Sequence, residues 1–100
     1  MSDLGLIVGF EWDEGNSRKS DEKHGVSWTE AEQVFLNQPL LVLDDVKHSQ
    51  SEPRFHALGR TTAGRLLHIS FTIRGAGTLI RVVSARDMSR QERDRYGQET

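Results

Sequence analysis

Arginine is the residue type with the clearest chemical potential in this chain, and its distribution is uneven. Only Arg18 precedes Arg54, whereas nine arginines lie from Arg54 to Arg95. Before Arg54 there are eleven acidic and four basic residues, so the formal net charge of -2 conceals a cationic second half. Guanidinium groups stay protonated and present a planar fork of donors that fits phosphate oxygens. The second half is therefore predicted to bind a phosphate-bearing partner, with nucleic acid as the first candidate.

Cleavage of RNA needs few protein groups, and this chain has the kind that it needs. The substrate supplies its own nucleophile, the 2′-hydroxyl, so the protein aligns it and stabilises the charge that grows on phosphorus. Arg60 and Arg81 are the candidates for that stabilisation, and Arg86 with the Arg90–Arg95 segment would hold flanking backbone. The structural alternative for Arg60 and Arg81 is an ion pair with an acidic residue of the first half.

Histidines offer a second chemistry, since a pair of imidazoles can serve as acid and base. His56 and His68 fall on neighbouring predicted strands as diagonal neighbours, on the order of 7 to 8 Å apart, which is a spacing that can straddle a phosphate. The alternative is that each is a half-buried strand histidine with a hydrogen-bonding role. His24 stands at a predicted helix end, where a positive group also interacts with helix carbonyls.

No metal or cofactor site is expected. The chain has no cysteine, and a set made of His48, Asp44 and Asp45 has no recognised ligand spacing. The glycines around Ala76 indicate a hairpin and not a phosphate-binding turn from strand to helix.

The bulk properties limit the class of protein. One hundred residues with 35% hydrophobic content suit a single domain with one modest core. The apolar stretch Leu4–Phe10 is far shorter than the roughly 20 residues of a membrane span, and it does not resemble a signal peptide. We expect a soluble, cytoplasmic protein that does not bind membranes.

Several elements are predicted for the first half. A short strand is expected at Leu6–Phe10, and a polar helix at Glu14–Lys23. Ser27-Trp28-Thr29-Glu30 is a capping box that predicts a helix from Trp28 to about Asn37. Pro39 ends it, and Leu40–Leu43 then predicts a strand that enters a polar loop.

The second half is predicted to form antiparallel strands and a terminal helix. A three-residue loop ending in Gly64 places Phe55 and Phe71 on one face, and a two-residue loop at Ala76-Gly77 sets Arg81 beside Thr72 on the other face. A second capping box at Ser89 predicts a basic helix through about Tyr96, closed by Gly97. The polar face is expected to gather Arg54, His56, Arg60, His68, Ser70 and Thr72. The fold class is thus α+β, a small antiparallel sheet with helices on one face.

Five strings occur together in the order and spacing of one known family. They are Phe10-Glu11-Trp12-Asp13, Lys23-His24-Gly25-Val26-Ser27, the segment His48–Arg60 ending in Leu58-Gly59-Arg60, Gly64-Arg65-Leu66-Leu67, and Arg81-Val82-Val83-Ser84-Ala85-Arg86. From about Phe10 to Tyr96 the chain resembles the BrnT toxins.

This resemblance implies a compact RelE-like fold, with residues 1–100 as one toxin domain whose ends, about 1–5 and 97–100, are frayed or disordered. It implies a metal-independent endoribonuclease of a type II toxin–antitoxin system that blocks translation and needs no cofactor. It also implies neutralisation by a ribbon-helix-helix antitoxin of BrnA type in a hetero-tetramer that binds DNA only through the antitoxin. His68 lies where relatives favour an aliphatic residue.

The residues expected to act follow from the charge pattern and the resemblance together. The catalytic candidates are Arg60, Arg81, Tyr96, Lys23 and His24. The candidates for RNA binding are Arg65, Arg86, Arg90 and Arg93. The competing hypotheses are a non-catalytic module that holds an acidic partner chain and modulates DNA binding, and a small-ligand phosphohydrolase, which would need a deep apolar pocket that nothing in the sequence indicates.

Overall fold

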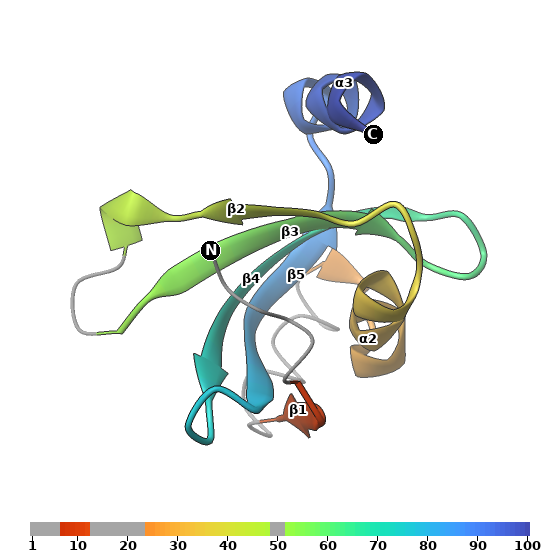
Figure 1. Ribbon diagram of the computed structural model, residues 1–100. Helices are drawn as coiled ribbons and strands as arrows, with labels where there is room; N and C mark the ends of the chain where they lie inside the picture. Colours follow the sequence, from red (N-terminus) through yellow and green to blue (C-terminus); the bar gives the residue numbers. More distant parts are fainter. Residues whose placement is uncertain (1–6, 13–23, 49–51) are drawn as a thin grey trace.

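The computed structural model describes residues 7–12, 24–48 and 52–100 as a five-stranded sheet with a helix on each side (Figure 1). The described elements are β1 Gly9–Glu11, α2 Trp28–Leu36, β2 Leu41–Asp44, the 3-10 helix η2 Val46–His48, β3 Arg54–Arg60, β4 Leu66–Arg74, β5 Leu79–Asp87 and α3 Arg90–Glu99. The strand order is β1-β5-β4-β3-β2. The helix expected at Glu14–Lys23 lies outside the described residues. No helix in the described parts is long and apolar enough to cross a membrane.

Both predicted capping boxes are present. At the start of α2, the Ser27 hydroxyl accepts from the Glu30 N–H at 3.2 Å and the Glu30 carboxylate accepts from the Ser27 N–H at 3.1 Å. Ser89 and Glu92 make the same reciprocal pair at the start of α3, at 3.2 and 2.8 Å. These side chains satisfy N–H groups that a helix start otherwise leaves without partners, which is why the local pattern sufficed to locate both helices.

The end of α3 differs from the prediction. The helix does not close at Gly97 but continues to Glu99. Arg95 pairs with Glu99 one turn later, an i to i+4 contact that supports the last turn. A glycine weakens a helix by about 1 kcal/mol without having to end it, and here this pair and the cap at Thr100 extend the helix past it.

The two hairpin registers are as predicted. Phe55 faces Phe71 across β3 and β4, and Gly64 in the connecting loop has a φ of 90°, a left-handed conformation that suits glycine. Thr72 faces Arg81 across β4 and β5. Turn chemistry therefore fixed which side chains share a face over most of the sheet.

A β-bulge in β5 was not predicted. The β4–β5 register shifts between Ser70 and Phe71, because Val83 has no residue opposite it. Arg81 and Arg86 are five positions apart and would point to opposite faces of a regular strand. The bulge turns both of them to the face that carries Ser70.

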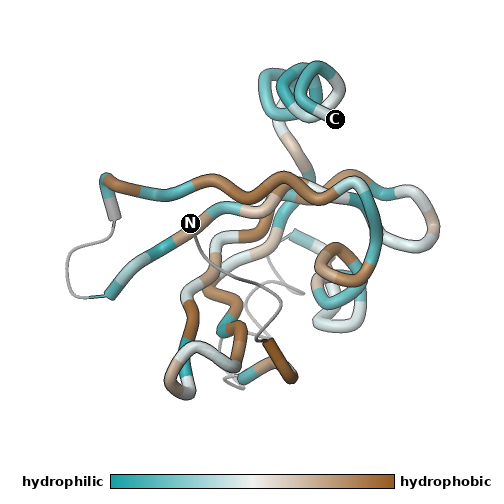
Figure 2. The backbone as a smooth tube through the Cα atoms, viewed as in Figure 1, coloured by the Kyte–Doolittle hydropathy of each residue, from teal (hydrophilic) through white to brown (hydrophobic). Residues whose placement is uncertain are grey.

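The main core lies between α2 and one face of the sheet. Ala31 and Val34 of α2 are 1% and 0% exposed and pack with Ala57, Ile69 and Phe71 of the strands. In Figure 2 the hydrophobic stretches of the strands and of α2 face one another across this layer. The alternation of apolar residues in β3 and β4 drives this packing, since it puts a continuous apolar surface on one face.

A second, smaller apolar cluster lies on the opposite face, under α3. Leu58 of β3 is 1% exposed and packs with Met88 and Tyr96, with Leu41 and Leu43 of β2 beside them. The α+β class is confirmed, but the prediction of helices on one face is wrong, since α2 and α3 lie on opposite sides of the sheet (Figure 1). Leucines on this face at one end of the sheet require a cover, and α3 with the residues before it supplies one.

The sheet is mixed and not wholly antiparallel. β1 runs parallel to β5 with Phe10 beside Ile80 and Glu11 beside Arg81, whereas the other three strand pairs are antiparallel. A sequence pattern does not reveal the direction in which a short edge strand pairs, because both directions bury the same alternate side chains. This edge strand places an acidic residue next to Arg81.

Candidate functional site

A cleft with a volume of about 380 Å³ lies between the sheet and α3. Its polar lining consists of His56, His68, Ser70, Ser84, Arg86 and Arg95, with Glu92 among them. Four strands and one helix contribute residues to the cleft, so no single segment of the sequence could have predicted it. Both predicted histidines and one predicted RNA-binding arginine, Arg86, come together here.

Strand register positions the floor of the cleft. His56, Ser70 and Ser84 are direct neighbours across β3, β4 and β5, and one step along the same face His68 lies beside Arg86. The bulge at Val83 is needed for this arrangement, because without it Arg86 would point into the main core. The expected diagonal placement of His56 and His68 is confirmed by the register. Their ring centroids are 4.6 Å apart, which is closer than the expected separation on the order of 7 to 8 Å, so the two rings pack together and do not straddle a phosphate.

His56 is held by a buried carboxylate. Its Nε2 atom lies 3.1 Å from Oδ2 of Asp45, whose side chain is 7% exposed, while the His56 side chain is 28% exposed. Its Nδ1 atom lies 3.4 Å from the Ser70 hydroxyl. Asp45 directly follows β2, and its N–H donates to the Arg54 carbonyl at 2.8 Å, which fixes it beside β3.

His68 has the opposite environment. It is 7% exposed, and burial together with the nearby Arg86 guanidinium lowers its pKa to about 4. The Glu92 carboxylate at 3.8 Å favours the charged form but does not outweigh burial. His68 is therefore neutral at pH 7, and the two histidines of the cleft are not equivalent.

Arg86 and Glu92 form a two-point ion pair across the cleft, with N–O distances of 2.8 and 2.9 Å. Burial disfavours ionised Glu92, yet the hydrogen bonds from Arg86 and from the Ser89 N–H outweigh it and lower its pKa to about 2. The hydrogen bond to Glu92 raises the pKa of Arg86. The carboxylate thus occupies the same two-pronged donor position that a phosphate would use.

Arg60 and Arg81 are not brought together. Arg60 is exposed at the end of β3, where its Nε donates to the Gln38 carbonyl at 3.0 Å. Arg81 lies 3.4 Å from Glu11 of the neighbouring strand. Six residue steps of β3, or about 20 Å, separate Arg60 from the level of Arg81 in the sheet. The expectation that both grip one phosphate is therefore wrong, and each faces a different part of the surface.

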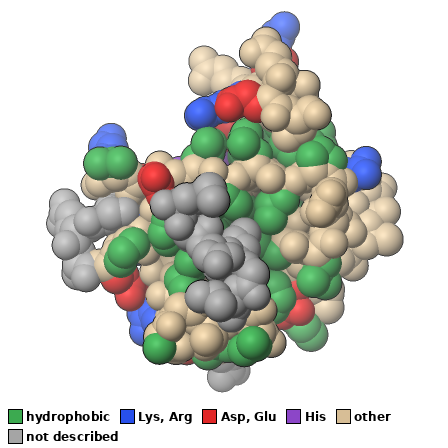
Figure 3. Space-filling model, viewed as in Figure 1, with side chains coloured by type: hydrophobic (Ala, Val, Ile, Leu, Met, Phe, Trp, Pro, Cys, Tyr) green, Lys and Arg blue, Asp and Glu red, His purple; other side chains and the backbone are tan. Residues whose placement is uncertain are grey.

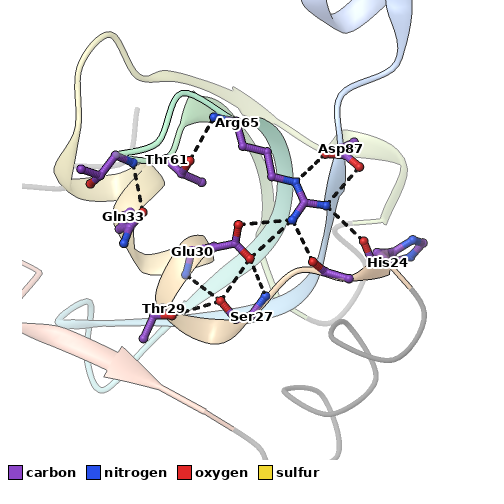
Figure 4. A network of polar contacts seen from close by, with 10 residues as sticks. His24, Ser27, Thr29, Glu30, Gln33, Thr61, Arg65 and Asp87 are labelled. Carbon is purple, nitrogen blue, oxygen red and sulfur yellow. Dashed lines mark hydrogen bonds and ion pairs between the residues drawn. The ribbon is translucent and has the colours of Figure 1, made fainter.

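Arg65 lies in a polar network that joins three segments (Figure 4). Its guanidinium binds the Asp87 carboxylate at 2.7 and 3.1 Å, Glu30 at 3.2 Å and the carbonyl of Gly25 at 2.8 Å. The Asp87 hydrogen bonds are the main reason that its pKa is raised further. These contacts give Arg65 a structural role, although it was expected to bind RNA.

Tyr96 and His24 also have structural contacts. Tyr96 is 7% exposed and its hydroxyl donates to the Pro39 carbonyl at 2.5 Å, so the placement offers no support for proton transfer by Tyr96. The His24 carbonyl accepts from Arg65 at 3.3 Å, on the side of the sheet that carries α2. Lys23 lies outside the described residues. Arg90 and Arg93 are exposed on α3, where Arg93 also donates to the Met88 carbonyl at 3.1 Å.

The cationic half is largely neutralised by carboxylates of the same molecule. Ion pairs hold the following arginines: Arg65, Arg74, Arg81, Arg86 and Arg95. On the side of the molecule shown in Figure 3, Lys and Arg lie scattered at the margins and form no continuous patch. The carboxylates of these pairs come from both halves of the chain: Glu11, Glu30 and Glu52 from the first, and Asp87, Glu92 and Glu99 from the second. Folding therefore compensates much of the charge asymmetry along the sequence.

No cluster of three or more His, Asp and Glu side chains that could hold a metal ion occurs in the described residues. The expectation of chemistry without a metal stays a prediction. Among the residues that line the cleft, sequence analysis gave no binding or catalytic role to Ser70, Ser84 and Glu92. It gave none to Asp45 either, which contacts His56 from outside this lining. For Asp45 a signal existed, since the pair Asp44-Asp45 directly follows an apolar strand; for the serines none did.

Comparisons with known proteins add independent findings. The family described as “Ribonuclease toxin, BrnT, of type II toxin-antitoxin system” matches residues 12–92. The 1.1 Å crystal structure of the Brucella abortus ribonuclease toxin, BrnT, is similar to this fold, with a TM-score of 0.61 and 20% identity, covering 84% of this chain and 100% of that chain. No curated protein sequence matches the chain. At this level of identity the crystal structure bears on the fold alone, and the family match bears on function.

Proposed function

Since the chain belongs to the family of BrnT ribonuclease toxins of type II toxin–antitoxin systems, we propose that it cleaves RNA in the cytoplasm by attack of the 2′-hydroxyl on the adjacent phosphate, without a metal ion. The attack needs an aligned ribose, a neutralised phosphate and groups that move protons. Cleavage of RNA then blocks translation.

The observation that carries this proposal is the cleft between the sheet and α3. It combines two guanidinium groups, Arg86 and Arg95, with two imidazoles in a space of about 380 Å³ that is open to solvent. Phosphate oxygens match the donor fork of Arg86, and a bound phosphate would take the place of the Glu92 carboxylate. Such a set suits a phosphodiester better than an apolar ligand.

Arginines around the cleft are proposed to bind the RNA backbone on either side of the cleaved bond. Arg81 lies on the same face of β5 and contacts backbone on one side of the scissile bond, and Arg90 and Arg93 on α3 contact backbone on the other. Arg60 contacts a more distant phosphate. Lys23 remains a candidate for proton transfer, whereas the geometry favours structural roles for Arg65 and Tyr96, and His24 is not among the residues that line the cleft.

A chemical test separates this mechanism from metal-dependent hydrolysis. The purified chain is incubated with a short RNA in the presence of EDTA, and with the same RNA carrying a 2′-deoxy sugar at the cleaved position. We expect unchanged cleavage in EDTA, products with 2′,3′-cyclic phosphate ends, and no cleavage of the deoxy substrate. Loss of activity in EDTA that a divalent metal restores, or products with 5′-phosphate ends, would contradict the mechanism.

Expression of the chain alone tests the role of the arginines. Arg86→Ala should lower cleavage by about 10²- to 10³-fold, because a lost donor to the charged phosphate costs about 3 to 4 kcal/mol in the transition state. Arg81→Ala, which removes a contact to flanking backbone, should lower cleavage by less. The thermal transition of each variant shows whether the fold is kept. Harmless expression of the unchanged chain with intact cellular RNA would favour the alternative of a non-catalytic module that holds an acidic partner.

The family also implies an antitoxin partner. We propose a ribbon-helix-helix antitoxin of BrnA type that neutralises the toxin in a hetero-tetramer and supplies the contacts to DNA. The toxin family supports this proposal. So do the ion pairs between arginines and carboxylates of the same molecule, because the side shown in Figure 3 has little continuous positive surface that could bind DNA. The mass of the purified complex checks the stoichiometry.

A further inference from the structure

The groups around His56 point to a defined role for its ring. A carboxylate at neutral pH has no hydrogen to donate, so the Nε2 atom facing Asp45 carries a hydrogen and the Nδ1 atom of the neutral ring is an acceptor. This acceptor lies on the side of Ser70 and the cleft. Asp45 therefore sets both the tautomer and the direction of the lone pair, as an orienting carboxylate does for a catalytic histidine.

The contact between Nδ1 and the Ser70 hydroxyl is long, at 3.4 Å. A substrate hydroxyl that enters the cleft can replace it at a shorter distance, since a weak hydrogen bond is easily exchanged. The His56 side chain is 28% exposed, so the ring is reachable, while its partner Asp45 is buried and fixed. An imidazole that substrate can reach, held in place by a buried carboxylate, is an arrangement suited to proton abstraction.

Other charged groups around the ring come from four elements or their ends. Asp45 follows β2, His68 belongs to β4, Arg86 to β5, and Glu92 and Arg95 to α3. Arg86 and Arg95 supply positive charge where the phosphate would lie, and Glu92 offsets part of it. His68 is neutral and packs against the His56 ring at 4.6 Å, so it limits the positions of that ring without competing for the proton.

We propose that His56 is the general base of the RNA cleavage proposed above, and that Asp45 is its positioning residue. Nδ1 of His56 takes the proton of the 2′-hydroxyl while the 2′-oxygen forms a bond to phosphorus. The bond between phosphorus and the 5′-oxygen breaks, and the leaving 5′-oxygen takes a proton from solvent water. Arg86 holds the non-bridging oxygens during this step. The inference rests on the proposed function, because it names the base at that site.

Two variants at His56 separate catalysis from folding. His56→Gln keeps a hydrogen-bond donor for Asp45 but has no basic nitrogen, and His56→Ala leaves space for added imidazole. With a short RNA that has one cleavage site, both variants should lower kcat by about 10²- to 10⁴-fold and leave KM within a few-fold, because general bases contribute rate enhancements of that size.

Asp45→Asn tests the positioning role. Loss of the carboxylate should lower kcat by about 10- to 100-fold, with KM nearly unchanged, because the ring loses the neighbour that sets its tautomer and orientation. Added imidazole should restore part of the activity of His56→Ala and none of that of Arg86→Ala. Gln91→Ala, an exposed change on α3 next to Glu92, is the control for local disturbance and should keep the activity of the unchanged chain.

The outcomes distinguish this inference from the proposed function. If the unchanged chain cleaves RNA and folded His56→Gln does so at the same rate and with the same pH profile, His56 is not the base, while the ribonuclease assignment stands. If the unchanged chain leaves every RNA intact, the proposed function fails and this inference fails with it. Thermal unfolding of each variant identifies any that lost activity through misfolding, in which case imidazole rescue of His56→Ala decides.

Discussion

Gly59 of β3 lies against Val34 of α2, and its missing side chain is what permits this contact. A Cβ atom at this position would lie 2.7 Å from Cγ1 of Val34 and 3.4 Å from its carbonyl oxygen. Val34 is fully buried, so its side chain has little room to move. The absence of a side chain at Gly59 therefore allows α2 to pack this closely against β3.

Gly59→Ala is expected to lower the free energy of unfolding by about 1 to 3 kcal/mol, because it overpacks the core between α2 and β3. Urea unfolding at neutral pH measures the change. The matched control is Gly97→Ala, since a Cβ at that position meets no atom within 4 Å and the site is inside α3. It should raise stability by up to about 1 kcal/mol. Equal effects of the two substitutions would contradict the close-approach argument.

At the scale of elements, the contacts of Arg65 explain how α2 is attached to the far end of β5. Its guanidinium binds Glu30 in the first turn of α2, Asp87 at the end of β5 and carbonyls of the segment that precedes α2 (Figure 4). The same Glu30 completes the capping box of the helix, and the hydrogen bond from the Ser27 N–H, followed by Arg65, lowers its pKa against the effect of burial. One side chain thus joins three segments.

Arg65→Lys should lower the free energy of unfolding by about 1 to 3 kcal/mol at pH 7, because an ammonium group keeps the charge but cannot bind two carboxylates and two carbonyls at once. Chemical denaturation measures it. Arg95→Lys is the control for the loss of a guanidinium, since Arg95 pairs with Glu99 at the surface of α3, where such pairs contribute less than about 1 kcal/mol. Arg65 would not be structural if both variants unfolded at the same urea concentration.

For the whole molecule, stability at acidic pH depends on the cleft under α3. The folded protein holds His68 neutral with a pKa of about 4, below its ordinary value of 6.5. Between these values the unfolded chain binds a proton that the folded protein does not, so the free energy of unfolding falls as pH falls from about 6.5 to about 4. Glu92, with a pKa of about 2, adds a further loss between its ordinary value of 4.5 and about 2.

Between pH 7.5 and 4.5 the His68 effect is expected to be on the order of 2 to 3 kcal/mol, because about two pKa units of the shift are crossed there and each corresponds to about 1.4 kcal/mol. Urea unfolding at several pH values between 7.5 and 4.5 should show a smaller loss for His68→Leu than for the unchanged chain. The difference between the two curves isolates His68 from the carboxylates that titrate in the same range. Parallel curves would show that protonation of His68 does not oppose folding.

The charge pattern is the clearest case in which the sequence and the molecule differ. The nine arginines from Arg54 onward indicated a phosphate-binding face, and an ion pair with the first half was the alternative for Arg81. Arg81 lies 3.4 Å from Glu11 because β1 pairs with β5 in parallel, a contact between residues seventy positions apart. Arg86 is held by Glu92, which the capping box also uses. Counting charged residues along the sequence does not predict which arginines will form ion pairs with carboxylates in the folded molecule.

The sequence by itself determined the features that arise within a few residues of one another. Capping boxes at Ser27 and Ser89 set both helix starts, and glycines in tight turns set the strand registers, because these signals act through local hydrogen bonds and backbone sterics. Only the tertiary structure decided that the bulge at Val83 turns Arg81 and Arg86 to one face, that α3 lies opposite α2, and that Asp45 meets His56. Those features depend on long-range packing, in which apolar surfaces and charges find whichever partners the whole fold brings near.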